Sequence, residues 1–183
     1  MNKDERTPLR LDAYPKTEAY LNTHREILAA RKYVIDAGRE WYEIWVPHNP
    51  KSWQKNKIVF PDISEKGIFS LDTSGSIVSG ECYWLVLNEN ENEELLYLIL
   101  GIANSKFIEK FYDISFPNKL YSGKRRFITQ YVNRFPIPNA RLKTSQEIVS
   151  IVKKLMSCKD EVQFLAYDKQ LNLLIDKAFG VST

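Results

Sequence analysis

The sequence contains few of the residues that build metal sites or disulfides. Among 183 residues there are two cysteines and two histidines, all far apart along the chain. Cys82 and Cys158 are therefore expected to be unrelated, reduced thiols. A structural zinc site needs four such ligands at close, regular spacing, so this pattern argues against one.

Long hydrophobic runs are also missing. The longest apolar run, from Leu95 to Ala103, has nine residues, whereas a helix needs about 20 to cross the hydrocarbon core of a bilayer. The first six residues, Met1 to Arg6, are polar and have no apolar segment behind them, so we expect no signal peptide. The sequence predicts a cytoplasmic protein with no membrane partner.

Catalytic motifs are absent as well. The chain contains no Gly-x-Gly-x-x-Gly, no Gly-Lys-Ser/Thr and no Gly-x-Ser-x-Gly, the motifs that bind dinucleotides and phosphates or carry an acyl-transfer serine. Nucleases commonly combine Pro-Asp with a later Asp/Glu-x-Lys. Pro61-Asp62 is present, but no lysine has an acidic residue two positions before it. We interpret Asp62 as a turn residue and expect no catalytic site within this chain.

What remains is a composition typical of a folded domain, with 44% hydrophobic and 13% aromatic residues. Strand-like and helix-like patterns do not alternate regularly, which predicts an α+β fold and argues against a doubly wound parallel sheet. Helices are expected at 15–32, at 95–102 and from Asn104 or Ser105, both good cap residues, to 112. Strands are expected at 40–46, 57–63, 68–71 and 81–87, the last of them rich in bulky residues. Residues 115–138 are expected to be irregular, with short strands at most. Pro61 favours an edge or a bend in its strand.

The last forty residues or so carry a different pattern. Thr144 and Glu147 match a capping box, which marks the start of a helix. Two apolar stripes follow, one over 148–155 and one over 164–178, and Gly180 suits the end of the second helix. Two amphipathic helices with a short link predict an antiparallel hairpin. We therefore divide the chain into residues 1–139 and a C-terminal helical hairpin at 140–183.

Charge is nearly balanced overall, because 26 Lys and Arg oppose 23 Asp and Glu for a net charge of +3. Its distribution is uneven. Between Ile114 and Gln146 there is no acidic residue, and aromatic residues lie between seven basic ones: Lys119, Lys124, Arg125, Arg126, Arg134, Arg141 and Lys143. Fixed cations bind phosphates, and Arg, Lys, Asn and Gln read base edges, so this stretch favours a nucleic-acid surface.

We assign candidate DNA contacts on this basis. Lys119, Lys124, Arg125, Arg126 and Arg134 would hold phosphates or read guanine. Tyr121, Ser122, Gln130 and Asn133 are candidates for base edges or sugars, and Ser122 precedes a glycine that would allow close approach to a backbone. Lys55 and Lys57, near Trp53, would flank the groove. Three alternatives stay open: a solvated basic face, an assembly module that uses the hairpin, and a small nuclease, which the missing carboxylate pattern disfavours.

The order of several short motifs resembles the C-terminal target-recognition domain of TaqI-type adenine-specific DNA methyltransferases, which also occurs in fused restriction–modification enzymes. The resemblance covers residues 14–181. Its motifs are Tyr20-Leu21 with Arg31, Trp41-Tyr42-Glu43-Ile44, Lys57-Ile58-Val59, Pro61-Asp62-Ile63-Ser64, Phe69-Ser70-Leu71-Asp72, Leu95 to Leu100, Ala103-Asn104-Ser105-Lys106 and Phe135-Pro136-Ile137-Pro138. The end of the chain, Leu174-Ile175-Asp176 and Ala178-Phe179-Gly180-Val181, resembles the helical tail that often follows this domain. The family usually has Leu-Asn-Ser where this chain has Ala103-Asn104-Ser105, a difference that we interpret as a packing change.

This resemblance implies an irregular, β-rich target-recognition domain with packed helices, here residues 1–139, followed by the hairpin. Such a domain binds double-stranded DNA against a separate methyltransferase domain, which flips out the adenine and uses S-adenosylmethionine. In fused enzymes a nuclease domain is a further partner. The catalytic Asn/Asp-Pro-Pro-Tyr/Phe motif is missing, because Asn49-Pro50 continues as Lys51-Ser52. The resemblance therefore implies a catalytic half, and a cofactor site, outside this chain.

Overall fold

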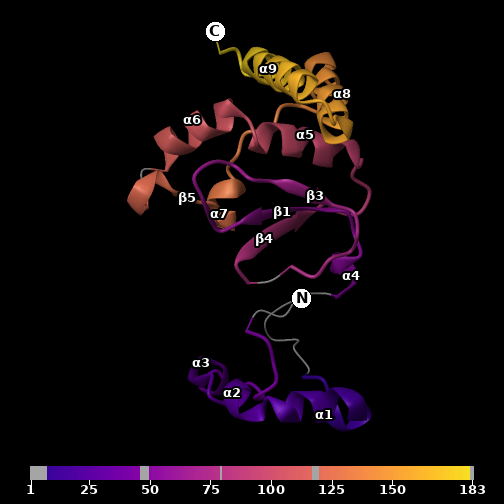
Figure 1. Ribbon diagram of the computed structural model, residues 1–183, viewed down its shortest axis with the longest axis vertical. Helices are drawn as coiled ribbons and strands as arrows, with labels where there is room; N and C mark the ends of the chain where they lie inside the picture. Colours follow the sequence, from indigo (N-terminus) through magenta and orange to yellow (C-terminus); the bar gives the residue numbers. More distant parts are fainter. Residues whose placement is uncertain (1–7, 46–49, 79, 117–119, 182–183) are drawn as a thin grey trace. The chain divides into compact units, whose positions relative to one another are not determined.

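The computed structural model describes residues 8–45, 50–78, 80–116 and 120–181 (Figure 1). The chain forms two compact units, Met1–Pro50 and Lys51–Thr183. The fold is α+β, as the sequence predicts: short antiparallel strands and several packed helices lie in the second unit. None of the helices in the described ranges is long and apolar enough to span a membrane.

The first unit is a series of short helices. They are η2 (Leu11–Ala13), α1 (Pro15–Thr23), α2 (Arg25–Ala29) and α3 (Lys32–Ile35). The prediction of one continuous helix over 15–32 is wrong, because the chain leaves helical geometry at His24 and again near Arg31. Val34 is the one large apolar side chain buried among the described residues of this unit.

The predicted strand at 40–46 is also wrong for the residues that the structure describes. Residues 40–43 form a turn, in which the amide of Glu43 donates to the carbonyl of Glu40 at 3.0 Å, and residues 44–45 are irregular. Arginine side chains, not a neighbouring strand, donate to the carbonyls: Arg31 to Trp41 at 2.7 Å and Arg39 to Ile44 at 2.7 Å. The sequence alternation of Tyr42, Ile44 and Val46 with Trp41, Glu43 and Trp45 imitates a strand pattern, but no strand of the described structure pairs with residues 40–45.

The second unit contains a three-stranded antiparallel sheet in the order β3–β1–β4, preceded by the short helix α4 (Pro50–Trp53). The strands are β1 (Lys57–Pro61), β3 (Ser70–Asp72) and β4 (Cys82–Val86). β1 is the central strand, so the expectation of an edge strand applies only at Pro61, where β1 pairs on one side alone. At Pro61 the strand pairs with Cys82 of β4, whereas its pairing with β3 reaches only to Val59. The missing amide hydrogen of Pro61 therefore costs no bond to β3.

Helix α5 (Glu94–Ala103) lies between this sheet and the C-terminal hairpin (Figure 1). Its buried side chains include Leu98 and Ile102, and α6 (Lys106–Ser115) follows after the predicted cap residue Ser105, whose hydroxyl accepts from the amide of Ile108 at 3.2 Å. A Cβ on Gly101 would lie 2.6 Å from Cγ2 of Val152. Glycine at this position allows α5 and α8 to pack closely.

The predicted hairpin is confirmed as α8 (Lys143–Ser157) and α9 (Glu161–Ala178), which pack against each other. The predicted capping box is wrong: α8 begins one residue before Thr144, and no side chain caps its start. Asp160 caps α9, accepting from the amide of Gln163 at 2.7 Å. Because α8 packs on α5, the hairpin shares a core with the rest of the second unit. The domain boundary at residue 139 stays a prediction.

Candidate nucleic-acid interface

The basic stretch folds as a short ribbon followed by a turn of helix. Strand β5 (Arg125–Arg126) pairs antiparallel with β2 (Ile63–Ser64), and α7 (Thr129–Val132) follows. The region predicted to be irregular therefore also holds a helical turn. Ahead of β5, residues 120–124 form what we call the β5 loop, which includes η3 (Tyr121–Gly123). The amide of Leu120 donates to the carbonyl of Lys124 at 2.9 Å and closes it.

The tip of the β5 loop has an unusual backbone. Ser122 and Gly123 both have positive φ, at 64° and 73°. This left-handed geometry costs glycine little and serine more. Two such residues in succession turn the chain sharply, so that the exposed Lys124 follows directly after the tip.

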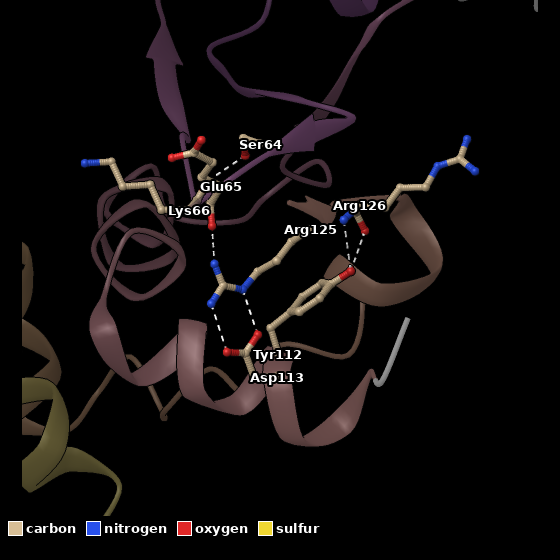
Figure 2. Close-up of polar contacts among 7 residues, drawn as sticks. All are labelled: Ser64, Glu65, Lys66, Tyr112, Asp113, Arg125 and Arg126. Atoms are coloured by element: carbon tan, nitrogen blue, oxygen red, sulfur yellow. Dashed lines mark hydrogen bonds and ion pairs between the residues drawn. The ribbon is translucent and has the colours of Figure 1, made fainter. Parts of the chain in front are cut away.

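The base of the loop is held by a buried tyrosine. The hydroxyl of Tyr112 donates to the carbonyl of Arg126 at 2.9 Å and accepts from its amide at 3.1 Å (Figure 2). Burial raises the pKa of the Tyr112 phenol, so it remains a donor. The amide of Phe127 donates to the carbonyl of Asp62 at 2.6 Å. Backbone and side-chain bonds together fix the ribbon on α6 and the end of β1.

Arg125 faces inward from this ribbon. Its Nε and Nη2 donate to the two carboxylate oxygens of Asp113 at 2.8 and 2.9 Å, and Nη1 donates to the carbonyl of Glu65 (Figure 2). Its side chain is only 12% exposed, and the Asp113 carboxylate raises the pKa of the guanidinium. All three nitrogens of Arg125 are engaged with protein acceptors. We therefore assign it a structural role and remove it from the candidate DNA contacts.

Arg126 extends away from this cluster, as Figure 2 shows. Its Nε lies 3.1 Å from Oδ1 of Asp62, and its Nη2 lies 3.2 Å from Oδ2. The side chain is 53% exposed, and the Asp62 carboxylate raises the pKa of its guanidinium. Arg126 thus keeps a solvent-accessible edge while one carboxylate orients it.

Lys57 does not lie on a groove. Its side chain is fully buried, with Nζ 2.7 Å from Oδ2 of Asp72 and 2.8 Å from the carbonyl of Trp53. Hydrogen bonds from Lys57 and Ser74 hold the pKa of Asp72 well below its usual value. The carboxylate also accepts from the amide of Ser76 at 3.1 Å. Lys57 therefore stabilises the turn at 72–76, and a buried ammonium cannot contact DNA.

Lys55 is exposed but lies away from the ribbon. It precedes β1, whereas β2, the strand that pairs with β5, follows the other end of β1. Five residues of strand separate the two places by roughly 17 Å. Lys55 also lines a pocket with Glu91 and Glu93, which makes its surroundings partly acidic. The structure separates this predicted contact from the others.

The other predicted contacts in the described region are exposed. They are Ser122, Lys124, Gln130, Asn133 and Arg134. The Arg134 guanidinium lies over the ring of Phe116 at 5.0 Å, a cation–π arrangement that fixes the side chain. Within the described residues, neither Lys124 nor Arg134 has a carboxylate partner. Lys119 and the side chain of Tyr121 lie outside what the structure describes. Lys124, Arg126 and Arg134 thus form the accessible basic set.

Sequence reasoning misses both carboxylates of this region. The interpretation of Asp62 as a turn residue overlooks its arginine partner, and Asp113 lies one position before the acid-free stretch. Both neutralise arginines of that stretch from other elements, and no local pattern marks them as partners. In the described part of the chain, no group of three or more Asp, Glu, His or Cys could hold a metal ion.

Comparison with known proteins shows the family to which the chain belongs. The TaqI-like C-terminal specificity domain matches residues 11–137. The chain belongs to this family. It is 44% identical over 169 residues, 92% of its length, to the type II methyltransferase M.BanIII of Aneurinibacillus aneurinilyticus, of which it covers 29%.

Two further relatives are more distant. The type II methyltransferase M.PaeR7I of Pseudomonas aeruginosa is 23% identical over 70% of this chain, which covers 21% of that protein. The type II methyltransferase M.BstVI of Geobacillus stearothermophilus is 22% identical over 76% of this chain, which covers 24% of that protein. The chain thus spans less than a third of the methyltransferases that it matches.

Proposed function

We propose that this chain is the part of an adenine-specific DNA methyltransferase, or of a fused restriction–modification enzyme, that recognises the DNA sequence. The proposal is supported by the family and by the similarity to type II methyltransferases. The single observation that carries it is the exposed basic surface of residues 124–134. Lys124, Arg126 and Arg134 are exposed on this segment, and its strand β5 is held by hydrogen bonds to the buried Tyr112.

The division of labour follows from what the residues can do. The exposed guanidinium and ammonium groups would bind phosphates and base edges of double-stranded DNA. Methyl transfer would belong to a separate methyltransferase domain, which would bind S-adenosylmethionine and carry the Asn/Asp-Pro-Pro-Tyr/Phe motif that this sequence lacks. In a fused enzyme a nuclease domain would be a further partner, and the whole enzyme would act in the cytoplasm.

A salt-dependent binding measurement tests this proposal. Fluorescence anisotropy with labelled duplex DNA should show tight binding at low salt. If about five phosphates are neutralised, the logarithm of affinity should fall against the logarithm of salt with a slope near −4 to −5. No binding at low salt, or a flat salt response, would contradict the proposal.

Charge reversal locates the surface. The double variant Lys124→Glu/Arg134→Glu should weaken binding strongly and reduce the salt slope by about two, because each lost phosphate contact removes about one unit. The matched control is Lys169→Glu, which reverses an exposed lysine on α9 and should leave affinity nearly unchanged. Equal losses of DNA affinity in both variants would mean that DNA does not bind specifically at Lys124 and Arg134.

The alternative function, an assembly module, is favoured by one observation. Val162, Leu165 and Leu173 are exposed on α9. Deleting the hairpin is a poor test, since α8 covers α5 and its removal would expose the core. Leu165→Glu is cleaner: a change from dimer to monomer in size-exclusion mass would support assembly, whereas a monomer in both forms would contradict it.

A further inference from the structure

Two consecutive arginines of β5 use their nitrogens differently. Arg125 donates from Nε, Nη1 and Nη2 to protein acceptors. In the described part of the chain, Arg126 donates from Nε and Nη2 to the carboxylate of Asp62. Within the described residues, Nη1 of Arg126 has no hydrogen-bond partner. A guanidinium held along one side in this way still presents the outer edge formed by Nη1 and Nη2.

That free edge has a specific chemical complement. Its two N–H groups point the same way and lie in one plane, so they match a pair of acceptors side by side. In the major groove, guanine offers O6 and N7 as such a pair, and the other three bases do not. The geometry of the Arg126 edge therefore suits a guanine.

The backbone of Arg126 is held before DNA arrives, and the Asp62 carboxylate orients its side chain. Both backbone groups of Arg126 bond to the Tyr112 hydroxyl, and the strand pairing places Ile63 opposite Arg126. Asp62 is held in turn, because its carbonyl accepts from the amide of Phe127 at 2.6 Å. A pre-oriented side chain loses less conformational freedom on binding than a free one.

Electrostatics favour a base over a phosphate as the partner of Arg126. The Asp62 carboxylate, itself 22% exposed, offsets the charge of the guanidinium, so the pair attracts a phosphate weakly. The directional N–H donors keep their ability to bond to a neutral acceptor. An unpaired lysine such as Lys124 suits a phosphate better.

We infer that Arg126 reads a guanine in the major groove and that Asp62 is the positioning residue that aims it. This inference rests on the proposed function, because it assigns one base contact of the DNA surface proposed above. It gives Asp62 a role in sequence selection, whereas Arg125, its neighbour on the ribbon, serves the fold.

Selection from a randomised duplex library tests the inference for any target sequence. The 183-residue chain is mixed with duplexes that contain a random segment, and bound DNA is sequenced. Wild type should enrich a motif with at least one G·C pair. Arg126→Lys keeps the positive charge and loses the two-donor edge, so it should lose about 10-fold or more of the preference at one G·C position. Its salt slope should stay the same.

A second variant separates aiming from folding. Asp62→Asn should reduce the same guanine preference and also make the salt slope steeper by about one, because the charge of Arg126 is no longer offset. If Asp62 served only the fold, its substitution would change neither the guanine preference nor the salt slope in this way. The matched control for Arg126→Lys is Arg10→Lys. Arg10 is another exposed arginine paired with an aspartate, Asp12, and its substitution should leave the enriched motif unchanged. Circular dichroism checks that each variant is folded.

The outcomes are distinct. If Arg126→Lys enriches the same motif as wild type with the same preference, the inference is overturned and the proposed function stands. The same holds if the wild-type motif has no G·C pair. If wild type enriches no sequence and does not bind duplex DNA, the proposed function fails and the inference fails with it.

Discussion

The two ends of strand β1 carry similar ion pairs in different surroundings. At its start, Lys57 pairs with Asp72 of β3, and the lysine is fully buried while the carboxylate is 16% exposed. Just beyond its other end, Asp62 pairs with Arg126 of β5, where the carboxylate is 22% exposed and the guanidinium 53%. The carboxylates have nearly equal exposure, so the main difference is the burial of the cation.

Because of this difference, the Lys57–Asp72 pair is structural, whereas the guanidinium of the Arg126–Asp62 pair is still accessible to a ligand. A buried ammonium has lost its water, so removing either member of its ion pair leaves the other charge uncompensated. A half-exposed guanidinium keeps part of its hydration, so its pairing adds little to stability. The Arg125–Asp113 pair lies between the two, with the guanidinium 12% exposed. Stability effects should therefore fall from Lys57 through Arg125 to Arg126.

The largest effect is expected at Lys57. Lys57→Met removes the partner of Asp72 and the donor to the Trp53 carbonyl. Breaking a buried pair from one side costs about 3–5 kcal/mol, and urea denaturation should show a loss in the free energy of unfolding of this size. The double variant Lys57→Met/Asp72→Asn should recover part of it. A loss below about 1 kcal/mol in the single variant would mean that burial of the cation does not decide stability here.

The same pair predicts a dependence on pH. The pKa of Asp72 is lowered in the folded protein by hydrogen bonds from Lys57 and Ser74. A carboxyl group with a lowered folded pKa contributes stability above its unfolded pKa of about 3.9 and loses it as pH falls toward the folded value. Wild type should thus be more stable than Asp72→Asn at neutral pH, and the gap should narrow below about pH 4. A gap that stays constant to low pH would contradict this assignment.

The comparison also shows how far the sequence could lead. Strong local signals were sufficient for β4, for the start of α6 at Ser105 and for the helical hairpin, because a run of bulky residues, a cap residue and apolar stripes are properties of nearby residues. The predicted strand at 40–46 failed because its two alternating faces have no strand to pair with in the described structure. Pairing depends on residues elsewhere in the chain.

The candidate site shows the same limit. The absence of acidic residues from 114–146 is a true feature of the sequence, yet Asp113 and Asp62 reach two of its arginines in space. Consecutive residues of a strand face opposite ways, so Arg125 turns inward and Arg126 outward. Sequence alone assigns both arginines the same role. Their opposite directions on β5 and the positions of the two carboxylates distinguish them.

An intermediate effect is expected at Arg125. Arg125→Gln removes a two-bonded contact with Asp113 and the bond to the Glu65 carbonyl. Hydrogen bonds that involve charged groups contribute about 1–3 kcal/mol, so urea denaturation should show a loss in this range, smaller than that for Lys57→Met. Hydrogen exchange should also become faster at the amide of Leu120, which closes the β5 loop. Unchanged exchange there would mean that the pair does not hold the loop.

The smallest effect on stability is expected at Arg126. Arg126→Gln removes a pair in which the cation is half in water, while the backbone bonds to Tyr112 remain. Solvent screening makes such a pair nearly neutral for folding, so the melting temperature should match that of wild type although DNA binding weakens. Arg125→Gln provides the matched control, since it makes the same substitution one residue away. If both variants melt equally early, Arg126 is structural too, and exposure of the cation does not distinguish the two ends of β1.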